Sequence, residues 1–158
     1  MADWGEDGWA VAAGSGSRVD QGPHWLEVLL RGRDVGGSMG AFVFDHDKIP
    51  ENPPHAHLAF MKILYVLDGR YEFRVGNAEL SAEPGTLLVV PRGSYHAFTT
   101  STGGRVLFVC SPSGNEEMFL EMGHLGTGAT PDQTAAVAAR FQTVSLSGEA
   151  GRAWKAAC

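Results

Sequence analysis

The sequence has few cysteines, no cluster of basic residues and no long apolar run, and each shortage excludes a class of protein. Its 158 residues include only two cysteines, Cys110 and Cys158, which are too few for a disulfide framework and are typical of reduced thiols. The 12 basic residues form no run and the formal net charge is −6, so we expect neither nucleic acid nor an anionic membrane as a partner. No apolar run approaches the ~20 residues of a membrane helix. Because the first ten residues are acidic and lack the layout of a signal peptide, we expect a cytoplasmic protein.

What the sequence does contain is a succession of short strand-like runs. Asp68-Gly69 predicts a tight hairpin between two of these runs, and Gly76-Asn77 predicts a second tight turn. Such short strands, with a turn about every ten residues, predict an antiparallel sandwich or barrel. The runs rich in β-branched and aromatic residues span 25–31, 39–45, 62–68, 70–76, 86–90, 94–100 and 105–111.

The two ends of the chain differ from this middle part. Residues 1–24 are rich in Gly, Ser, Asp and Ala, which predicts a flexible N-terminal arm. Residues 113–158 predict C-terminal helices and a tail, with helices over 115–123 and 130–141. Thr130 is the expected N-cap of the second helix, followed by Pro131 in its first turn. The β domain itself is expected over residues 25–112.

Three histidines give the first indication of function. His55 and His57 are two residues apart, so in an extended segment both rings leave the same face of the chain. A His-x-His pair also occurs in exposed loops, where it binds nothing. His96 follows a Pro-x-Gly turn on a later strand, and a β-barrel brings such strands together. Three neutral imidazoles with open coordination positions are a suitable ligand set for a transition metal.

The segments around these histidines resemble the two sequence motifs of the cupin superfamily. The first motif contains a His-x-His pair and a later glycine, and the second contains a glycine, a Pro-x-Gly turn and a histidine. The resemblance extends over most of residues 25–112, and the C-terminal part is similar to small quercetin-dioxygenase-like and polyketide-cyclase cupins. It implies an all-β fold, a single cupin (jelly-roll) β-barrel with a short helical C-terminal appendage. The matching residues are His55, His57, Gly69, Gly85, Pro91, Gly93 and His96.

Three positions depart from the cupin motifs. Ile49 stands where the first motif has its leading glycine, and Thr100 stands where the second has its terminal asparagine. Lys62 replaces the glutamate that the resemblance implies as a fourth protein ligand. The lysine bears directly on both the metal and the reaction.

A lysine in that place changes the electrostatics of the site. If Lys62 points into the barrel about 4 Å from a dication, the repulsion is about 8 kcal/mol at an effective dielectric of about 20. Lowering its pKa from about 10.4 to neutrality costs only about 5 kcal/mol, so deprotonation is favoured. The alternatives are a lysine turned away onto a carboxylate and a lysine that replaces the metal. Strict alternation counted from His57 predicts that the side chain of Lys62 faces solvent. The strand interruption in the cupin pattern allows it to face inward instead.

Other residues are weaker candidates for a role in the site. Glu51 precedes the histidines and can supply the carboxylate that Lys62 does not, although a loop glutamate is more often simply solvated. With His96 as the inward reference, strand parity predicts that Phe98 and Phe108 line the barrel. Cys110 shares that parity and is expected to be a buried, inert thiol. The histidines outside the motifs are expected at the surface or in caps: His24, His46 and His124.

The ligand set and the resemblance together lead to three hypotheses about function. The first is an oxygenase that uses a metal and O2 on a small enol, aromatic or polyketide-like molecule. The second is a non-oxidative cyclase or isomerase of secondary metabolism, in which a Lewis-acid metal polarises a carbonyl. Both assign the metal to the three histidines and acid–base work to Lys62, with Glu51 as a further catalytic candidate. The third is a ligand-binding cupin without catalysis. We expect an enzyme, with the oxygenase ahead of the cyclase or isomerase.

The same reasoning predicts the cofactor and the partners. Iron and zinc are the metals expected first, with nickel, copper and manganese as alternatives, and no metal if Lys62 occupies the site. A small molecule is the expected substrate. A homodimer is also expected, because small cupins commonly pair by their sheet faces and because Ile63, Tyr65 and Leu67 give one strand an apolar outer face.

Overall fold

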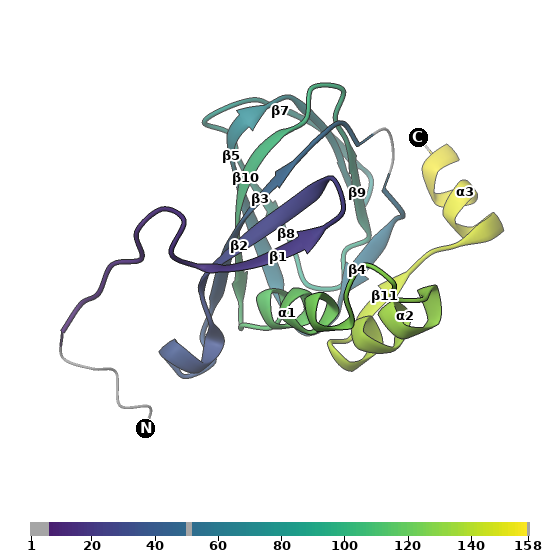
Figure 1. Cartoon of the computed structure of the whole chain (residues 1–158). Coiled ribbons are helices and arrows are strands. Elements are labelled where there is room, and N and C mark those ends of the chain that lie inside the picture. The colour runs from purple at the N-terminus through teal and green to yellow at the C-terminus, as the bar shows by residue number, and fades with distance from the viewer. Residues whose placement is uncertain (1–6, 50–51, 158) are drawn as a thin grey trace.

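Two antiparallel sheets face each other in the computed structural model, which describes residues 7–49 and 52–157 (Figure 1). One sheet has six strands in the order β1-β2-β3-β10-β5-β8, and the other has five in the order β11-β4-β9-β6-β7. The strands are β1 (Ser17–Gln21), β2 (His24–Leu30), β3 (Gly40–His46), β4 (His55–His57), β5 (Met61–Gly69), β6 (Tyr71–Val75), β7 (Ala78–Ala82), β8 (Leu87–Val90), β9 (His96–Thr99), β10 (Gly104–Ser111) and β11 (Thr143–Ser145).

The core lies between the sheets, and strand alternation decides which side chains enter it. A pleated strand sends successive side chains to opposite faces. On β5, Lys62, Leu64 and Val66 are therefore buried, whereas Tyr65 and Leu67 are exposed on the opposite face. The sequence predicted this division into two faces and left open whether Lys62 points inward. The buried apolar cluster consists of Val19, Leu26, Val28, Phe42, Leu64, Val66, Tyr71, Phe73, Ala82, Leu88, Val90, Val106 and Phe108.

All seven predicted strands are present, and their ends differ from the prediction by at most two residues. Four further strands were not predicted: β1, β4, β7 and β11. Of these, β1 lies in the segment predicted as an N-terminal arm, where it pairs with β2 from Ser17↔Val28 to Gln21↔His24. The six-stranded sheet thus begins at Ser17, ahead of the predicted start of the β domain.

The two predicted tight turns have different structures. Gly76-Asn77 joins the paired strands β6 and β7 as a hairpin, with Gly76 at φ +57°. Asp68-Gly69 does not form the predicted hairpin, because β5 and β6 belong to different sheets. Gly69 has φ +90°, and a Cβ there would collide with the carbonyl of Gly103. This glycine is therefore needed at a corner where the chain crosses from one sheet to the other.

The sheets do not close into the single barrel that the sequence predicted. In residues 7–49 and 52–157, no strand ladder joins the six-stranded sheet to the five-stranded one. The fold is mostly β, as predicted, but it consists of two facing antiparallel sheets with three helices.

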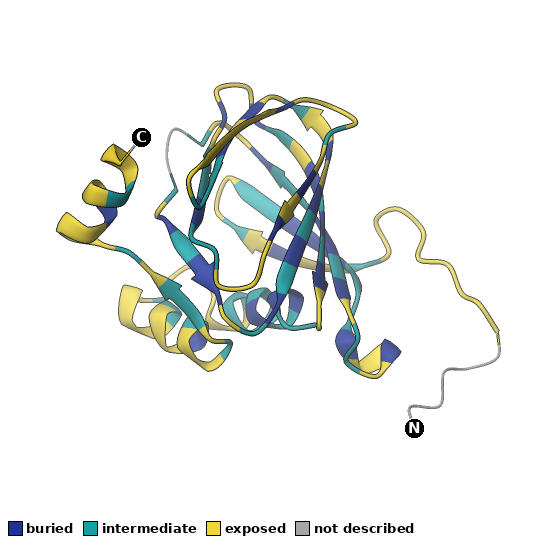
Figure 2. Ribbon diagram, turned by 180° about the vertical axis from the view of Figure 1, so that it is seen from behind, coloured by how far each residue is buried: buried dark blue, intermediate teal, exposed yellow. Residues whose placement is uncertain are grey.

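The three helices lie outside the sheets. They are α1 (Asn115–Leu125), α2 (Pro131–Arg140) and α3 (Gly148–Ala156), of which α3 was not predicted. α2 begins as expected, with Thr130 accepting a hydrogen bond from the backbone N–H of Gln133 and with Pro131 as its first residue. α1 contacts β1, β3 and α2 at one end of the sheets (Figure 1). Figure 2 shows α2 and α3 largely exposed, and neither they nor α1 is long and apolar enough to cross a membrane.

Candidate functional site

Three histidines come together on neighbouring strands of the five-stranded sheet. His55 and His57 are the first and last residues of β4, and His96 is the first residue of β9, where it pairs with His55. The turn before β9 is tied to β4, because the N–H of Gly93 donates to the carbonyl of His57 at 2.8 Å. One ligand nitrogen from each histidine lies within 4.8 Å of the others. This is the clustering that the spacing of the sequence predicted.

Hydrogen bonds at Nδ1 orient the rings. The Nδ1 of His55 lies 2.9 Å from the carbonyl oxygen of Pro53, and that of His96 lies 3.0 Å from the carbonyl oxygen of Ser94. Because a carbonyl can only accept, each Nδ1 carries the proton and each Nε2 keeps a lone pair. The Nε2 atoms of His57 and His96 are buried and have no hydrogen-bond partner in the described part of the chain.

Thr143 orients the third ring, and the sequence analysis did not identify it. Its hydroxyl lies 2.8 Å from Nδ1 of His57 and donates to Sδ of Met118 at 3.5 Å. Since the hydroxyl proton points to the sulfur, the oxygen accepts from Nδ1–H and leaves Nε2 of His57 unprotonated. Thr143 is placed there by the pairing of β11 with β4, in the register Thr143↔His57 and Ser145↔His55. A three-residue strand after a helix has no periodicity that could have revealed this.

Burial keeps the three imidazoles uncharged. Desolvation, followed by the charge of Lys62, lowers the pKa of His55 to about 4 and also lowers the pKa of His57 and of His96. Neutral imidazole is the form that binds metal ions. Two buried Nε2 atoms without a partner, beside a third imidazole, therefore fit a transition metal such as iron or zinc better than magnesium or calcium, which prefer oxygen.

Lys62 faces the histidines from the opposite sheet. The parity argument from His57 fails because β4 ends at His57 and β5, which begins at Met61, belongs to the other sheet. Lys62 is only 5% exposed and lines the same cavity as the histidines, with Nζ 5.5 Å from the ring centre of Phe108. Within residues 7–49 and 52–157 no carboxylate forms an ion pair with it. Desolvation lowers the pKa of Lys62 from 10.5 to about 7.

These residues line a cavity of about 320 Å³ between the sheets. Phe98 and Phe108 line it, as predicted. Asn115 and Met118 of α1 contribute to its wall, together with Thr143 of β11. Six phenylalanines in all face the cavity, so it is a largely apolar space with a few polar groups at defined places. They are Phe42, Phe44, Phe73, Phe98, Phe108 and Phe119.

The remaining candidates have separate outcomes. Glu51 lies outside the described residues. His124 is exposed, as expected. His46 is not at the surface as predicted: it is 4% exposed, and its Nε2 accepts from the hydroxyl of Tyr71 at 3.0 Å. His24 lies next to it, with ring centres 6.1 Å apart and a buried Nδ1. Both belong to an aromatic cluster of the core.

Cys110 is a buried thiol, as the parity argument predicted. Its Sγ donates to Oε2 of Glu116 at 3.1 Å. Desolvation and the nearby Glu116 raise the pKa of Cys110 to about 11. The thiol therefore stays protonated at neutral pH and is a poor nucleophile.

Comparisons with known proteins agree with this fold. The family model of the cupin domain matches residues 46–111, which include the three histidines and Lys62. No curated protein matches the sequence. Residues 46–111 are therefore a cupin domain, and the two facing antiparallel sheets have the cupin fold.

Three solved structures illustrate the similarity. An RmlC-like cupin from Shewanella frigidimarina has 20% identity and a TM-score of 0.60, over 70% of this chain and 96% of that one. Pac13, a nucleoside dehydratase from Streptomyces, has 14% identity and a TM-score of 0.56, over 70% and 88%. The polyketide cyclase RemF from Streptomyces resistomycificus has 21% identity and a TM-score of 0.55, over 66% and 80%. At these identities the likeness is one of fold.

Proposed function

We propose that this cupin is a metal-dependent, non-oxidative cyclase or isomerase that acts on a small aromatic, enol or polyketide-like molecule. His55, His57 and His96 would hold the metal, and Lys62 would be the acid–base residue. The observation that carries the proposal is the position of Lys62, which is buried in the cavity opposite the histidines and forms no ion pair with a carboxylate in the described residues.

An amine in this position is suited to moving a proton. A pKa of about 7 leaves a large fraction of Lys62 neutral at physiological pH, so that Nζ can accept a proton and return it. Nζ removes the proton from the carbon next to a substrate carbonyl. The electron pair of that C–H bond forms a carbon–carbon double bond, and the π pair of the carbonyl moves to its oxygen, which gives an enolate. Nζ then returns the proton at another position, which completes an isomerisation, or after a new carbon–carbon bond has formed, which completes a cyclisation.

The other residues of the cavity support this step. A metal held by the three histidines supplies Lewis-acid stabilisation of negative charge on the substrate oxygen. The phenylalanine-lined wall binds the apolar part of the substrate and excludes water. Because the surroundings are apolar, they also keep Lys62 from being protonated permanently.

The oxygenase placed first from the sequence stays a second candidate. In an O2-dependent reaction Lys62 would deprotonate or orient the substrate, while the oxidation itself would depend on the metal and O2. In a non-oxidative proton transfer, the amine carries out the chemical step itself. The shared fold with a polyketide cyclase and a nucleoside dehydratase supports the non-oxidative reading only in that the fold accommodates such reactions.

Exchange of the α-proton tests the proposal. Zinc-loaded and iron-loaded protein is incubated in D2O, without oxygen, with a panel of aromatic β-dicarbonyl compounds, and deuterium at the α-carbon is followed by NMR. We expect exchange in the unsubstituted protein, loss of exchange in Lys62→Met, and full exchange in Lys48→Met, in which an exposed lysine is changed. Turnover only in matched samples that contain O2 would favour the oxygenase instead. Binding of the compounds without exchange or turnover would favour the ligand-binding cupin.

A further inference from the structure

Asn115 presents an unused amide in the wall of the cavity. It is the first residue of α1, it is 1% exposed, and it lines the cavity together with Lys62 and the histidines. Its Nδ2 is buried and has no hydrogen-bond partner among the residues that the structure describes. Of the unpartnered buried atoms in that part of the chain, those at the cavity belong to His57, His96 and Asn115. A metal accounts for the two imidazoles and leaves the amide unexplained.

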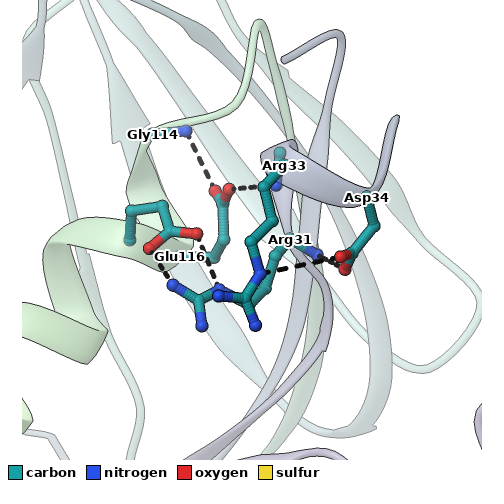
Figure 3. Close-up of polar contacts among 7 residues, drawn as sticks. Arg31, Arg33, Asp34, Gly114 and Glu116 are labelled. Atoms are coloured by element: carbon teal, nitrogen blue, oxygen red, sulfur yellow. Dashed lines mark hydrogen bonds and ion pairs between the residues drawn. The ribbon is translucent and has the colours of Figure 1, made fainter. Parts of the chain in front are cut away.

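The first turn of α1 is fixed, so Asn115 is held in place. The carboxylate of Glu116, the next residue, accepts from the N–H of Gly32 at 3.1 Å and from the N–H of Gly114 at 3.0 Å (Figure 3). Glu117 accepts from two guanidinium nitrogens of Arg31 at 2.7 and 2.6 Å. These contacts tie the start of α1 to the segment after β2. A side chain on such a rigid support is preorganised for binding.

The amide is not needed for the fold. Gly114 occupies the N-cap of α1, and no side chain caps this helix, whereas Thr130 caps α2. Asn115 therefore takes no part in capping, and its side chain makes no hydrogen bond to the rest of the described chain. A buried amide without a partner is unfavourable, and a leucine of similar size would suit the apolar wall better. A ligand that forms a hydrogen bond with the amide would offset this cost and would explain why a polar residue occupies the position.

Asn115 and Lys62 line the same cavity. Cys110 is the cross-strand partner of Lys62, and its thiol donates to Glu116, the neighbour of Asn115 in sequence. Cys110 therefore connects the strand that carries Lys62 with the first turn of α1, which carries Asn115. An oxygen of the substrate that binds the amide would bring the adjacent carbon toward the amine.

We propose that Asn115 is a substrate-binding residue whose side-chain amide hydrogen-bonds a carbonyl or phenolic oxygen on the edge of an aromatic substrate. The inference rests on the proposed function and specifies its substrate class. Six phenylalanines accept a flat ring system, and the amide requires an oxygen at one position on its edge. The amide can donate from Nδ2 to a carbonyl or accept at Oδ1 from a hydroxyl.

Two probes of nearly the same shape test this assignment. 2-Acetonaphthone carries a carbonyl oxygen where 2-isopropenylnaphthalene carries a CH2 group. Their dissociation constants are measured by calorimetry with metal-free protein, so that a metal does not contribute. We expect the unsubstituted protein to prefer the ketone by roughly tenfold or more. Asn115→Leu should lose this preference, bind the alkene with unchanged affinity, and melt at the same or a higher temperature. Asn115→Ala should lose the preference as well, and it serves if the leucine variant does not fold.

The control is Met118→Leu, a change in the same wall that should affect both probes alike. Equal affinity of the unsubstituted protein for the two probes, no binding of either, or an undiminished preference in Asn115→Leu would overturn the proposal. The test is independent of catalysis. If Asn115→Leu loses the preference for the ketone and no sample exchanges the α-proton, the binding role of Asn115 is supported and the proposed reaction is contradicted. If exchange depends on Lys62 but the unsubstituted protein binds both probes equally, the proposed reaction is supported and the binding role of Asn115 is contradicted.

Discussion

Lys62 lies on the sheet opposite the three histidines, and its amine must coexist with whatever they bind. Protonated, it would repel a dication held by the histidines and would form no ion pair with a carboxylate of the described residues. Burial removes this conflict, because desolvation lowers the pKa of Lys62 to about 7. The same cavity lowers the pKa of each histidine. The site is therefore built from four nitrogen groups that can all be neutral near pH 7.

Metal content is the most direct test of the histidine cluster. Untagged protein purified without chelators should contain about one transition metal ion per chain by elemental analysis, because three neutral imidazoles converge. The double variant His55→Ala/His57→Ala should lose it. His124→Ala, in which an exposed histidine outside the cavity is changed, should keep it. Equal metal in the double variant and in the unsubstituted protein would show that the ion binds elsewhere.

Replacing Lys62 should stabilise the metal-free protein in a pH-dependent way. The pKa of Lys62 is about 7 in the folded chain and 10.5 as its ordinary value, so between these pH values the unfolded chain binds a proton that the folded chain does not. Stability rises with pH where the unfolded state binds more protons. Lys62→Met removes this dependence. At pH 7 the free energy of unfolding of Lys62→Met should exceed that of the unsubstituted protein by a few kcal/mol, at most about 5. At pH 9.5 this difference should be smaller by about 3 kcal/mol.

Urea denaturation of chelator-treated protein at the two pH values measures this difference. Lys48→Met is the control, since Lys48 is exposed, and its stability should follow that of the unsubstituted protein at both pH values. A gain in Lys62→Met of the same size at pH 7 and pH 9.5 would mean that the folded amine titrates normally.

At the scale of elements, the site depends on a strand from the far end of the sequence. β11 follows two helices, yet it pairs with β4 and completes the hydrogen bonding of His57 through Thr143. The C-terminal segment is therefore part of the candidate metal site, in addition to covering one end of the sheets (Figure 1). Groups that orient a histidine ligand commonly affect metal affinity by 10- to 100-fold.

Thr143→Val should weaken metal binding by about tenfold, because the valine cannot accept the proton of Nδ1 and no longer fixes the ring of His57. Thr143→Ser keeps the hydroxyl and should retain most of the affinity. Ser145→Ala, on the same strand and paired with His55, should change it little. Zinc dissociation constants from competition with a chromophoric chelator measure all three. An affinity in Thr143→Val equal to that of Thr143→Ser would remove the positioning role.

The elements also explain what the sequence could and could not predict. The long strands alternate over five or more residues, so the two faces of β5 could be told apart, with Lys62, Leu64 and Val66 together on one of them. β4 and β11 have three residues each, too few for a period, and their pairing is a long-range contact with no local signal. His55 and His57 were predictable because their spacing is local, and His96 was predictable from its place in the second cupin motif. Thr143 and Asn115 were not, since their roles arise only from how the C-terminal segment packs on the sheets.

Lys62 also shows that local patterns do not assign a strand to a sheet. Parity counted from His57 could not place Lys62, because the strand break at residues 58–60 moves the chain from one sheet to the other. The predicted hairpin at Asp68-Gly69 was wrong for a related reason. A local turn signal does not show whether the two strands that it joins will pair with each other. Local patterns therefore predicted most of the longer elements, whereas the assignment of elements to sheets came from tertiary packing.

At the scale of the whole molecule, the outer face of the six-stranded sheet carries apolar side chains at its edge. Leu87 and Val89 of the edge strand β8 are 58% and 47% exposed, and Tyr65 and Leu67 of the adjacent β5 are 40% and 41% exposed. Tyr65 is directly paired with Leu87 across the two strands. Contiguous exposed apolar side chains of this kind commonly mark an interface. We propose that a second copy of the chain covers this face in a homodimer.

Charge placed on this face should separate the dimer. Leu87→Lys/Val89→Lys puts two like charges per chain into the proposed interface, where each would be desolvated beside its counterpart in the second copy. Sedimentation velocity of untagged protein at micromolar concentration should give a dimer for the unsubstituted chain and a monomer for the double variant. Leu125→Lys, which changes an exposed apolar residue at the end of α1, should remain a dimer. Because the substituted side chains point away from the cavity, metal content should be unchanged in the monomer. A monomeric unsubstituted protein would contradict the homodimer, and a double variant that stays dimeric would place the interface on another face.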